Sequence, residues 1–599
     1  MPVREDRIPR RPALAAALLS ALAALSTLAF ILINGVNVPF ADEWWYSGLV
    51  KAVASGQATF GSFWSPNNEH RMLIPRLEFS TLAVLTRWNS KAMMITGWLM
   101  AVLAMLLLFS QFKRLYSRSH PILWTVAVGV AAASLFSLVQ MENWLWSFQF
   151  AFFFIQFTVV ASLIILCRTE LALWLRILAV ATLGAAASFS SAQGLLLWPA
   201  LIFSLCLTDD PFRKKAIGVF CLLVSAAVTF ALYFSGLPRT TELHLRPEQI
   251  MEKVQLPFFG FLGLVGNPLA HWISYEHLPH RAWFIGLFIT IIFFFLTATV
   301  IKRRRLPDAA PWLGLGAYAY SFCLVTTYGR LGMGYTGGFL ASRYTTHVSL
   351  LLIAIQALIL IAIGSEEPSP QPIGRRISRG QVWSAFAAIF AIGALLIIGD
   401  FQSFKAGSVE HRDRQLAKSL IPFSSYFDPE VDGMTTGPFY PLCPLRCRPI
   451  LNIGIRPLSD AGYYQRLDDV SFSSTEPEVN GRYTIGRKIV EVRYLGIVER
   501  GWKLSGSISL GPKMNPDLVF LRPVGSNAFI AAAALRPADD HREAGNRYQW
   551  QLFLSPFILP DPKTPLEMWV YNPQANEFLK IHQDADRWEK TDHPKTSGI

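Results

Sequence analysis

Two adjacent carboxylates, Asp42 and Glu43, stand directly before two tryptophans in the loop of residues 34–91, which separates the first apolar run from the next clear one. A carboxylate near an attacking hydroxyl can accept its proton, so Asp42 is the candidate general base of a transfer reaction, with Glu43 beside it in the same acidic motif. If the first run crosses a membrane, the loop begins at the level of the lipid headgroups, where tryptophans concentrate. The alternative interpretation is a solvated loop start beside an interfacial tryptophan belt.

The same loop contains Glu69, His70 and Arg71 in consecutive positions. Consecutive residues of a helix point in different directions, so these side chains can face one ligand only in a turn or at a helix start. We expect His70 or Arg71 to contact a phosphate, and Glu69 to orient it or to hold a divalent metal. A plain helix N-terminus with an acidic first turn is the alternative. The following segment, residues 72–88, predicts a helix that lies at the membrane surface.

Further ionisable residues fall on the same predicted face of the membrane. Glu142 stands in a short turn at the outer end of the third apolar run, and Arg330 and Arg343 bracket a glycine-rich loop between two later runs. A guanidinium suits a lipid phosphate because it stays charged and binds oxyanions through two parallel hydrogen bonds. Arg343, followed by Tyr344, is the stronger candidate because the next helix would begin there and add its N-terminal dipole. An exposed acid at a helix end and snorkelling arginines are the alternatives.

Residues 236–281 form a predicted external loop with several histidines, two of them three positions apart. That spacing can bring two imidazoles to one metal on a helix, but Pro279 lies between them and no paired motif occurs elsewhere. A metal site there is therefore not favoured. The histidines are His244, His271, His277 and His280.

The composition indicates a polytopic membrane protein. Of 599 residues, 52% are hydrophobic and only 16% are charged, which is too apolar for a soluble chain. About eleven apolar runs approach the length of about 20 residues that crosses a bilayer core, and we expect the first to be an uncleaved anchor rather than a signal peptide. The runs cover residues 13–33, 92–110, 121–140, 148–167, 171–188, 194–208, 216–235, 282–301, 310–328, 346–364 and 381–399.

Basic residues cluster between alternate runs, so we interpret the net charge of +13 as a topology signal and not as a nucleic-acid-binding surface. With a cytoplasmic N-terminus, the positive-inside rule places every cluster on the cytoplasmic side. The external side then receives the acidic, histidine and arginine residues described above, and this gathering predicts a functional site. The clusters are Arg4 to Arg11, Lys113 to Arg118, Arg168, Arg213 to Lys215, Lys302 to Arg305 and Arg375 to Arg379.

Beyond residue 400 the chain changes to prolines, glycines and short alternating segments. We expect a linker over residues 401–430 and an extracytoplasmic antiparallel β-sandwich over residues 431–599. Cys443 and Cys447 predict a short-loop disulfide, because no second Cys or His pair is close enough to complete a metal site. We expect the module to cover the external face and to position an acceptor, with tryptophans that either stack on sugars or fill the core. These are Trp502, Trp550 and Trp569.

These features resemble the GT-C superfamily of integral membrane glycosyltransferases. In that family the first extracytoplasmic loop carries an acidic pair that includes the catalytic residue, and Asp42 and Glu43 match it in placement. A second acidic motif in the next external loop corresponds to Glu142, which here lacks an adjacent acid and so leaves metal dependence open. A later arginine that binds the carrier phosphate corresponds to Arg343 or Arg330. The family's transmembrane catalytic domain and external C-terminal domain correspond to residues 1–400 and 431–599.

The resemblance implies an enzyme of the bacterial inner membrane that transfers a hexose or pentose from a polyprenyl-phosphate carrier to an extracytoplasmic glycan, lipid or protein, in glycan biosynthesis for the cell envelope. Two other classes stay open. A transporter or flippase of lipid-linked glycans would place charges inside its spans and often contain two related halves, whereas these spans are nearly free of charge. A non-enzymatic scaffold that displays the β-rich module would not need the carboxylates and arginines.

Overall fold

A computed structural model of the protein divides the chain into two compact units. The first unit consists of Met1–Gly35 and Ala58–Ser408, and the second of Val36–Gln57 and Val409–Ile599. The structure describes residues 8–67, 70–237, 255–271, 278–330, 339–364, 379–427, 439–442, 454–455, 458–459, 462–467, 469–473, 481–494, 497–510, 516–537, 547–555, 558–559, 561 and 563–588.

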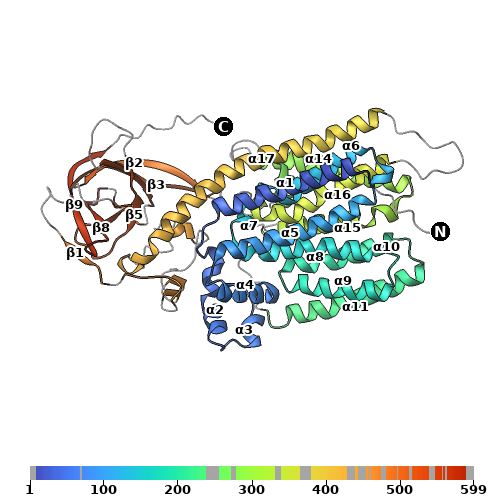
Figure 1. Ribbon diagram of the computed structural model, residues 1–599, viewed down its shortest axis with the longest axis horizontal. Coiled ribbons are helices and arrows are strands. Elements are labelled where there is room, and N and C mark those ends of the chain that lie inside the picture. The colour runs from blue at the N-terminus through green and yellow to red at the C-terminus, as the bar shows by residue number, and fades with distance from the viewer. Residues whose placement is uncertain are drawn as a thin grey trace. The chain divides into compact units, whose positions relative to one another are not determined.

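The first unit is a bundle of apolar helices that run side by side (Figure 1). Among the described residues, eight helices are long and apolar enough to cross a membrane, and three shorter apolar helices accompany them. The protein is a multi-pass membrane protein. The eight are α1 (Arg10–Asn34), α5 (Ser90–Lys113), α6 (Pro121–Phe136) with η3 (Leu138–Gln140) and α7 (Met141–Trp144), η4 (Ser147–Gln149) with α8 (Phe150–Leu166), α11 (Phe212–Phe234), α14 (Leu278–Lys302), η10 (Ser342–Tyr344) with α16 (Thr345–Ile363), and α17 (Arg379–Ser419). The shorter ones are α9 (Leu173–Ser188), η5 (Ala192–Leu196) with α10 (Leu197–Leu207), and α13 (Gln255–Gly266), which leads into η6 (Asn267–Leu269).

These helices follow the predicted runs, but among the described residues three of the about eleven expected spans are not among the eight: runs 171–188 and 194–208 form the shorter helices α9 and η5 with α10, and run 310–328 differs as well. The run 310–328 forms α15 (Leu306–Gly329), a helix of 24 residues that does not meet the criteria of length and hydropathy met by the eight. The helix α13 lies within residues 236–281, where the sequence predicts a loop, so part of that segment is helical. It packs against α14 so closely that a Cβ on Gly286 would lie 1.9 Å from the carbonyl oxygen of Leu262. Small residues allow such close approach of apolar helices.

The helix α16 is the innermost helix of the bundle, with nearly every residue buried between α6, α8 and α15. Two of its polar groups accept hydrogen bonds from a neighbouring helix: Nε2 of Gln156, on α8, donates to the carbonyl oxygen of Thr346 at 2.7 Å and to Oγ of Ser349 at 3.2 Å. Buried polar groups at membrane depth need such partners because no water competes for them. This fixed helix sets the position of Arg343 at its start.

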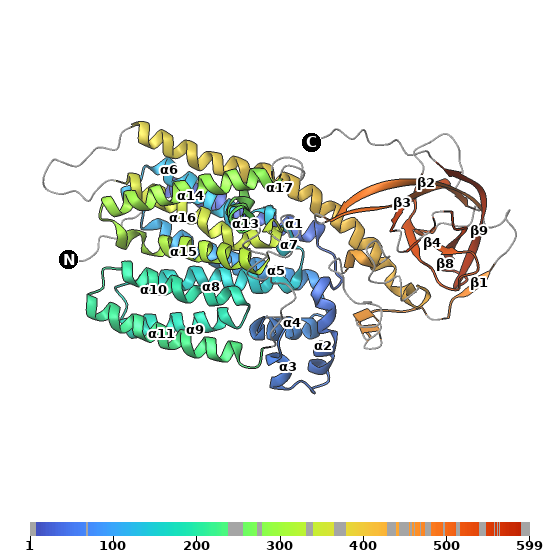
Figure 2. The same ribbon diagram turned by 180° about the vertical axis from the view of Figure 1, so that it is seen from behind.

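The two ends of the bundle differ in charge. At one end Arg114 pairs with Glu170 at 2.7 Å, and Nη1 of Arg305 donates to the carbonyl oxygen of Ile361 at 2.8 Å. The basic clusters that follow α5, α8, α10 and α14 all lie at this end, in agreement with the predicted alternation of spans (Figures 1 and 2). The opposite end holds α3 (Phe60–Trp64), α4 (Leu73–Leu85) and α7. The helix expected within residues 72–88 is therefore present as α4, and its contact with a membrane surface stays a prediction.

The second unit brings the acidic motif together with the C-terminal part of the chain. Its N-terminal portion contains η1 (Ala41–Tyr46) and α2 (Ser47–Ala54), and its C-terminal portion starts with the last turns of α17. Two short helices follow, η11 (Ile421–Tyr426) and η12 (Tyr440–Leu442). The sequence places residues 36–57 with the membrane spans, so this association was not expected.

A sheet of nine strands follows, in the order β5-β4-β8-β9-β2-β3-β7-β6 with β1 beside β9. Most neighbours are antiparallel as predicted, but β1 and β2 run parallel to β9. The long β9 joins two halves, since residues 577–581 pair with β8 and residues 582–588 with β2. The strands are β1 (Ser471–Ser473), β2 (Gly481–Tyr494), β3 (Ile497–Leu510), β4 (Leu518–Pro523), β5 (Ala531–Ala534), β6 (Arg536–Pro537), β7 (Arg547–Leu554), β8 (Leu566–Asn572) and β9 (Glu577–Trp588).

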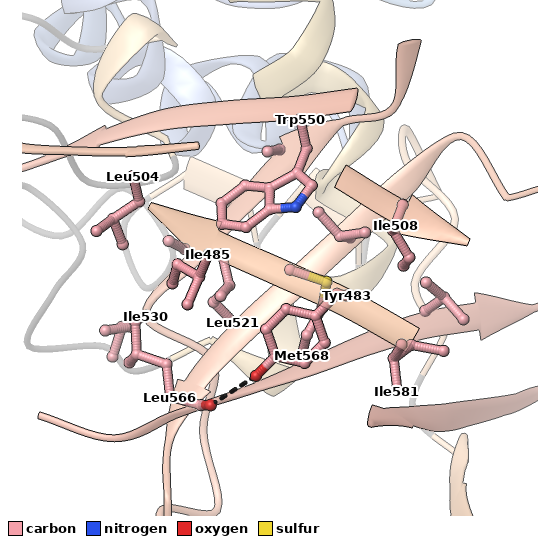
Figure 3. Close-up of a cluster of buried hydrophobic side chains, with 14 of the residues drawn as sticks. Tyr483, Ile485, Leu504, Ile508, Leu521, Ile530, Trp550, Leu566, Met568 and Ile581 are labelled. Carbon is pink, nitrogen blue, oxygen red and sulfur yellow. Dashed lines mark hydrogen bonds between the residues drawn. The ribbon is translucent and has the colours of Figure 1, made fainter. Parts of the chain in front are cut away.

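Both halves of the sheet bury side chains in one core (Figure 3). Tyr483 and Trp550 lie in this core, and the Tyr483 hydroxyl donates to the carbonyl oxygen of Leu566 at 2.9 Å. Trp550 and Trp569 are each 3% exposed, and Nε1 of the partly buried Trp502 donates to a backbone carbonyl oxygen at 2.8 Å. Of the two roles considered for these tryptophans, core packing is confirmed and sugar stacking is not.

Candidate functional site

Glu142 and Arg343 form an ion pair at the end of the bundle opposite the basic clusters. Nη1 of Arg343 donates to Oε1 of Glu142 at 2.6 Å, and the backbone N–H of Arg343 donates to Oε2 at 3.3 Å. The two side chains are mostly buried, at 13% exposure for Glu142 and 18% for Arg343. The sequence singled out each residue by a separate argument, and the structure places them in contact.

A break after α6 positions Glu142. Ser137 leaves the helical conformation, with φ −56° and ψ 137°, and begins the short turns that lead to Glu142. Asp400, on α17, accepts two hydrogen bonds at Oδ1, from Oγ of Ser137 at 2.6 Å and from the backbone N–H of Leu138 at 2.7 Å. Sequence reasoning missed Asp400, whose only signal was a carboxylate at the end of a long apolar run.

Backbone contacts connect the two sides of the ion pair. The Ser342 hydroxyl donates to the carbonyl oxygen of Val139 at 2.6 Å and accepts from the backbone N–H of Glu142 at 3.3 Å. Nδ2 of Asn143 donates to the carbonyl oxygen of Arg343 at 2.8 Å and to Oγ1 of Thr346 at 2.7 Å. The backbone on both sides is therefore fixed, and Arg343 presents its guanidinium from the first turn before α16.

A buried histidine supports the segment that precedes Arg343. Nδ2 of Asn267 donates to the carbonyl oxygen of Ala341 at 3.3 Å, so its Oδ1 faces Nε2 of His271 at 2.8 Å. Because an amide oxygen only accepts, His271 donates from Nε2. Burial, and then the charge of Arg281, lowers the pKa of His271 to about 4. The imidazole is therefore neutral near pH 7 and acts here as a hydrogen-bond donor.

Asp42 and Glu43 lie in η1, in the second unit. Glu43 is fully buried, and its Oε2 accepts from the backbone N–H of Phe40 at 3.2 Å, which caps the start of η1. Asp42 is partly exposed. Ala41, directly before it, has φ +49°, in the left-handed region that disfavours residues with a Cβ. Glu43 thus maintains the turn, and Asp42 beside it is only partly buried.

Arg71 fastens segments of the first unit to one another. Its Nε donates to the carbonyl oxygen of Tyr233 at 2.9 Å, its Nη1 to that of Trp64 at 2.6 Å, and its Nη2 to that of Ser235. The side chain is 3% exposed. All three nitrogens donate to backbone carbonyls, which favours a structural role for Arg71, and phosphate binding by this residue stays a prediction. His70 exchanges backbone hydrogen bonds with Asn67 at 2.8 and 2.9 Å.

Two further candidate residues are Arg330 and Tyr344. Arg330 caps the C-terminal end of α15, and Tyr344 is buried with its ring 5.1 Å from the guanidinium carbon of Arg343. Within the part of the chain that the structure describes, no group of three His, Cys, Asp or Glu residues could hold a metal ion. Several predicted residues lie outside the described ranges: Glu69, His244, His277, Cys443 and Cys447.

The ion pair has the chemistry of an anion site. The guanidinium precedes the N-terminus of α16, where helix dipole and backbone N–H groups favour negative charge. Glu142 pairs with this guanidinium, and a phosphate can bind the same kind of cation through charge-assisted hydrogen bonds.

No family model matches this chain, and no curated protein matches it. Two solved structures are similar to it. One is ArnT from Cupriavidus metallidurans bound to undecaprenyl phosphate, at 13% identity and a TM-score of 0.38, over 69% of this chain and 81% of that one. The other is the archaeal oligosaccharyltransferase AglB from Archaeoglobus fulgidus in complex with an inhibitory peptide and a dolichol-phosphate. It has 11% identity and a TM-score of 0.41, over 77% of this chain and 62% of that one.

Proposed function

We propose that the protein is a membrane glycosyltransferase that moves a hexose or pentose from a polyprenyl-phosphate carrier to an extracytoplasmic glycan, lipid or protein. The observation that carries the proposal is the Glu142–Arg343 pair, a guanidinium held by a carboxylate at the end of the bundle opposite the basic clusters. The positive-inside rule favours a cytoplasmic position for the basic end, which supports our placing the pair on the external face of the membrane, and we propose a bacterial inner membrane as the location.

In the proposed reaction a hydroxyl oxygen of the acceptor attacks the anomeric carbon of the sugar. The bond from that carbon to the phosphate oxygen breaks, and the polyprenyl phosphate leaves with the electron pair. Asp42 accepts the proton of the attacking hydroxyl, and Arg343 stabilises the charge that develops on the leaving phosphate. Glu142 orients Arg343 between turnovers.

The test is sugar transfer in proteoliposomes, with undecaprenyl phosphate carrying a radiolabelled hexose or pentose as donor. We expect release of undecaprenyl phosphate by the wild-type protein and a loss of about 100- to 10,000-fold in Asp42→Asn, which keeps the shape of the side chain but removes the base. Asp209→Asn, an exposed aspartate at the basic end, is the matched control and should stay active. Full turnover in Asp42→Asn would rule out Asp42 as the base.

The same vesicles separate this proposal from its two alternatives. A flippase of lipid-linked glycans would move the labelled lipid between leaflets without cleaving the sugar–phosphate bond, and a scaffold would do neither. Orientation is tested by labelling single cysteines in intact cells: Asn527→Cys should react with an impermeant reagent, and Arg213→Cys should be protected.

A further inference from the structure

The turn that carries Asp42 is held by residues near the other end of the sequence. Trp44 is 1% exposed, and its Nε1 donates to the carbonyl oxygen of Leu442, 398 positions later, at 3.3 Å. Gly454 lies against the same indole: a Cβ there would come within 2.4 Å of Cε3. The ring of Tyr464 is 6.5 Å from that of Trp44, centroid to centroid. Leu442, Gly454 and Tyr464 thus form a socket for the side chain of Trp44.

A second contact holds the turn on the other side of Asp42. The guanidinium carbon of Arg414 lies 3.3 Å from the centre of the Phe40 ring, and Arg414 pairs with Glu410 one turn earlier on α17. Arg414 is 2% exposed, so this cation–π contact is shielded from water, where such contacts are strongest. Residues from the C-terminal part of the chain therefore contact the turn both before and after Asp42.

The backbone between these contacts is strained. Ala41 has φ +49°. For a residue with a Cβ such a conformation costs roughly 1–3 kcal/mol and persists only where the surroundings over-determine it. The contacts of Phe40 and Trp44 supply that constraint from either side. Without them, residues 41–43 would relax to ordinary backbone angles and the carboxylate of Asp42 would move.

We propose that Arg414, Gly454 and Tyr464 are positioning residues for the carboxylate of Asp42, so that the C-terminal segment completes the reactive turn. This inference rests on the proposed function, in which Asp42 accepts the acceptor proton. It assigns the C-terminal part of the chain a role in the chemical step itself, separate from binding an acceptor. The glycine at position 454 is required because the indole of Trp44 occupies the space of a side chain.

The test is Gly454→Ala in the sugar-transfer assay. The new methyl group would displace the rigid indole, and because a shift of about 1 Å in a reacting group can lower the rate about 100-fold, we expect kcat to fall by roughly 10- to 100-fold. The KM for the donor should stay within about twofold, since Arg343 binds the phosphate independently. Gly48→Ala is the matched control: it lies in α2 of the same unit with no atom within 4 Å of the added Cβ, and should have normal turnover.

Rescue distinguishes positioning from general damage. Phenylalanine lacks the Cε3 atom that the new methyl group would meet, so Gly454→Ala with Trp44→Phe should recover part of the lost kcat. A fall in kcat and donor affinity together, without recovery in the double variant, would indicate a folding defect and overturn the proposal.

The remaining outcomes also decide the question. Normal turnover in Gly454→Ala, with Asp42→Asn inactive, would refute the positioning role and leave the proposed function intact, whereas an active Asp42→Asn would remove the proposed function itself. If Gly454→Ala does not accumulate in membranes, the same kinetic constants are measured for Arg414→Leu instead. A lower kcat at unchanged donor KM supports the inference, and a normal kcat overturns it.

Discussion

The two halves of the Glu142–Arg343 pair should affect donor binding in opposite directions. Arg343→Ala removes the cation that we propose binds the carrier phosphate. A hydrogen bond to a charged group contributes about 1.5–3 kcal/mol, so undecaprenyl phosphate should bind roughly 10- to 150-fold more weakly. Glu142→Gln has the reverse effect, because it removes the negative charge that competes with the phosphate for the guanidinium.

The size of the second effect follows from the geometry. The 2.6 Å contact between Nη1 and Oε1 places the charge centres about 4 Å apart, where the attraction is on the order of 4 kcal/mol at an effective dielectric constant near 20. Desolvation of the pair offsets much of this attraction. We therefore expect Glu142→Gln to bind undecaprenyl phosphate about 3- to 10-fold more tightly, while losing turnover because Arg343 is no longer oriented between cycles.

Binding of undecaprenyl phosphate to purified protein in detergent measures both effects, with undecaprenol as the ligand that lacks the charge. Arg114→Ala and Glu170→Gln are matched controls, since this pair has nearly the same separation, 2.7 Å, but is exposed and lies at the basic end. Neither control should change affinity by more than about twofold, because exposed ion pairs contribute little. If Arg343→Ala and Glu142→Gln both weaken binding, or neither changes it, the pair is structural and our assignment of the phosphate site is refuted.

Four further outcomes are expected. Asp400→Asn keeps the Oδ1 acceptor for Ser137 and Leu138 and should retain the turnover rate of the wild-type protein, whereas Asp400→Leu removes the acceptor and should lower that rate about 10-fold or more. An equal fall in turnover in both variants would mean that the negative charge itself is required. Asp210→Asn should lower the free energy of unfolding by about 3 kcal/mol, seen as a lower melting temperature, because Arg176 is 1% exposed and would keep an unpaired charge. The pKa of His271 is lowered to about 4 in the folded protein, so as the pH falls the imidazole is protonated in the unfolded chain before it is protonated in the folded one. The contribution of His271 to the free energy of unfolding should be fully present above about pH 6.5 and should fall by about 1.4 kcal/mol per pH unit toward pH 4. In His271→Gln the melting temperature should no longer have this pH dependence. Truncation after residue 425 removes Leu442, Gly454 and Tyr464, so donor hydrolysis and sugar transfer should both be lost while undecaprenyl phosphate still binds; surviving hydrolysis would show that these residues are dispensable for the chemical step.

The helical part of the fold could be predicted because membrane spans follow from local composition. Apolar runs, their lengths and the basic clusters between them are properties of short stretches, so nearly every run appears as a helix close to its expected limits. The segment of α13 was misassigned because its apolar stretch of 12 residues is too short to span a membrane alone. The helix α13 is held by close packing against α14, where Gly266 of α13 and Gly286 of α14 each lie against backbone atoms of the other helix. A single sequence does not show this packing.

The candidate site could be predicted only in part. Glu142 and Arg343 attract notice as rare charged residues at the ends of apolar runs, and that signal is local. Their contact, and the support from Asp400 and His271, depend on which helices become neighbours. Arg71 has the same residue type as Arg343 and a similar setting, but the carbonyls at the end of α11 occupy its guanidinium. Residue type alone could not separate an arginine paired with a carboxylate from one engaged by backbone carbonyls.

The contacts of the acidic motif suggest a different role for the C-terminal region from the one that the sequence suggests. From the sequence, residues 431–599 are an accessory module, since they contain no carboxylate pair with a basic partner, and their tryptophans suggest contact with sugars. In the structure those tryptophans fill the core, while a different tryptophan, Trp44, enters a socket built by the C-terminal segment. Because the reactive turn of an enzyme must keep its geometry while substrates exchange, packing it against residues hundreds of positions away provides a constraint that an isolated loop between two spans would lack. If Asp42 is the base, as proposed, the C-terminal region contributes to the chemical step through the turn that it supports, even though none of its own side chains needs to touch the sugar.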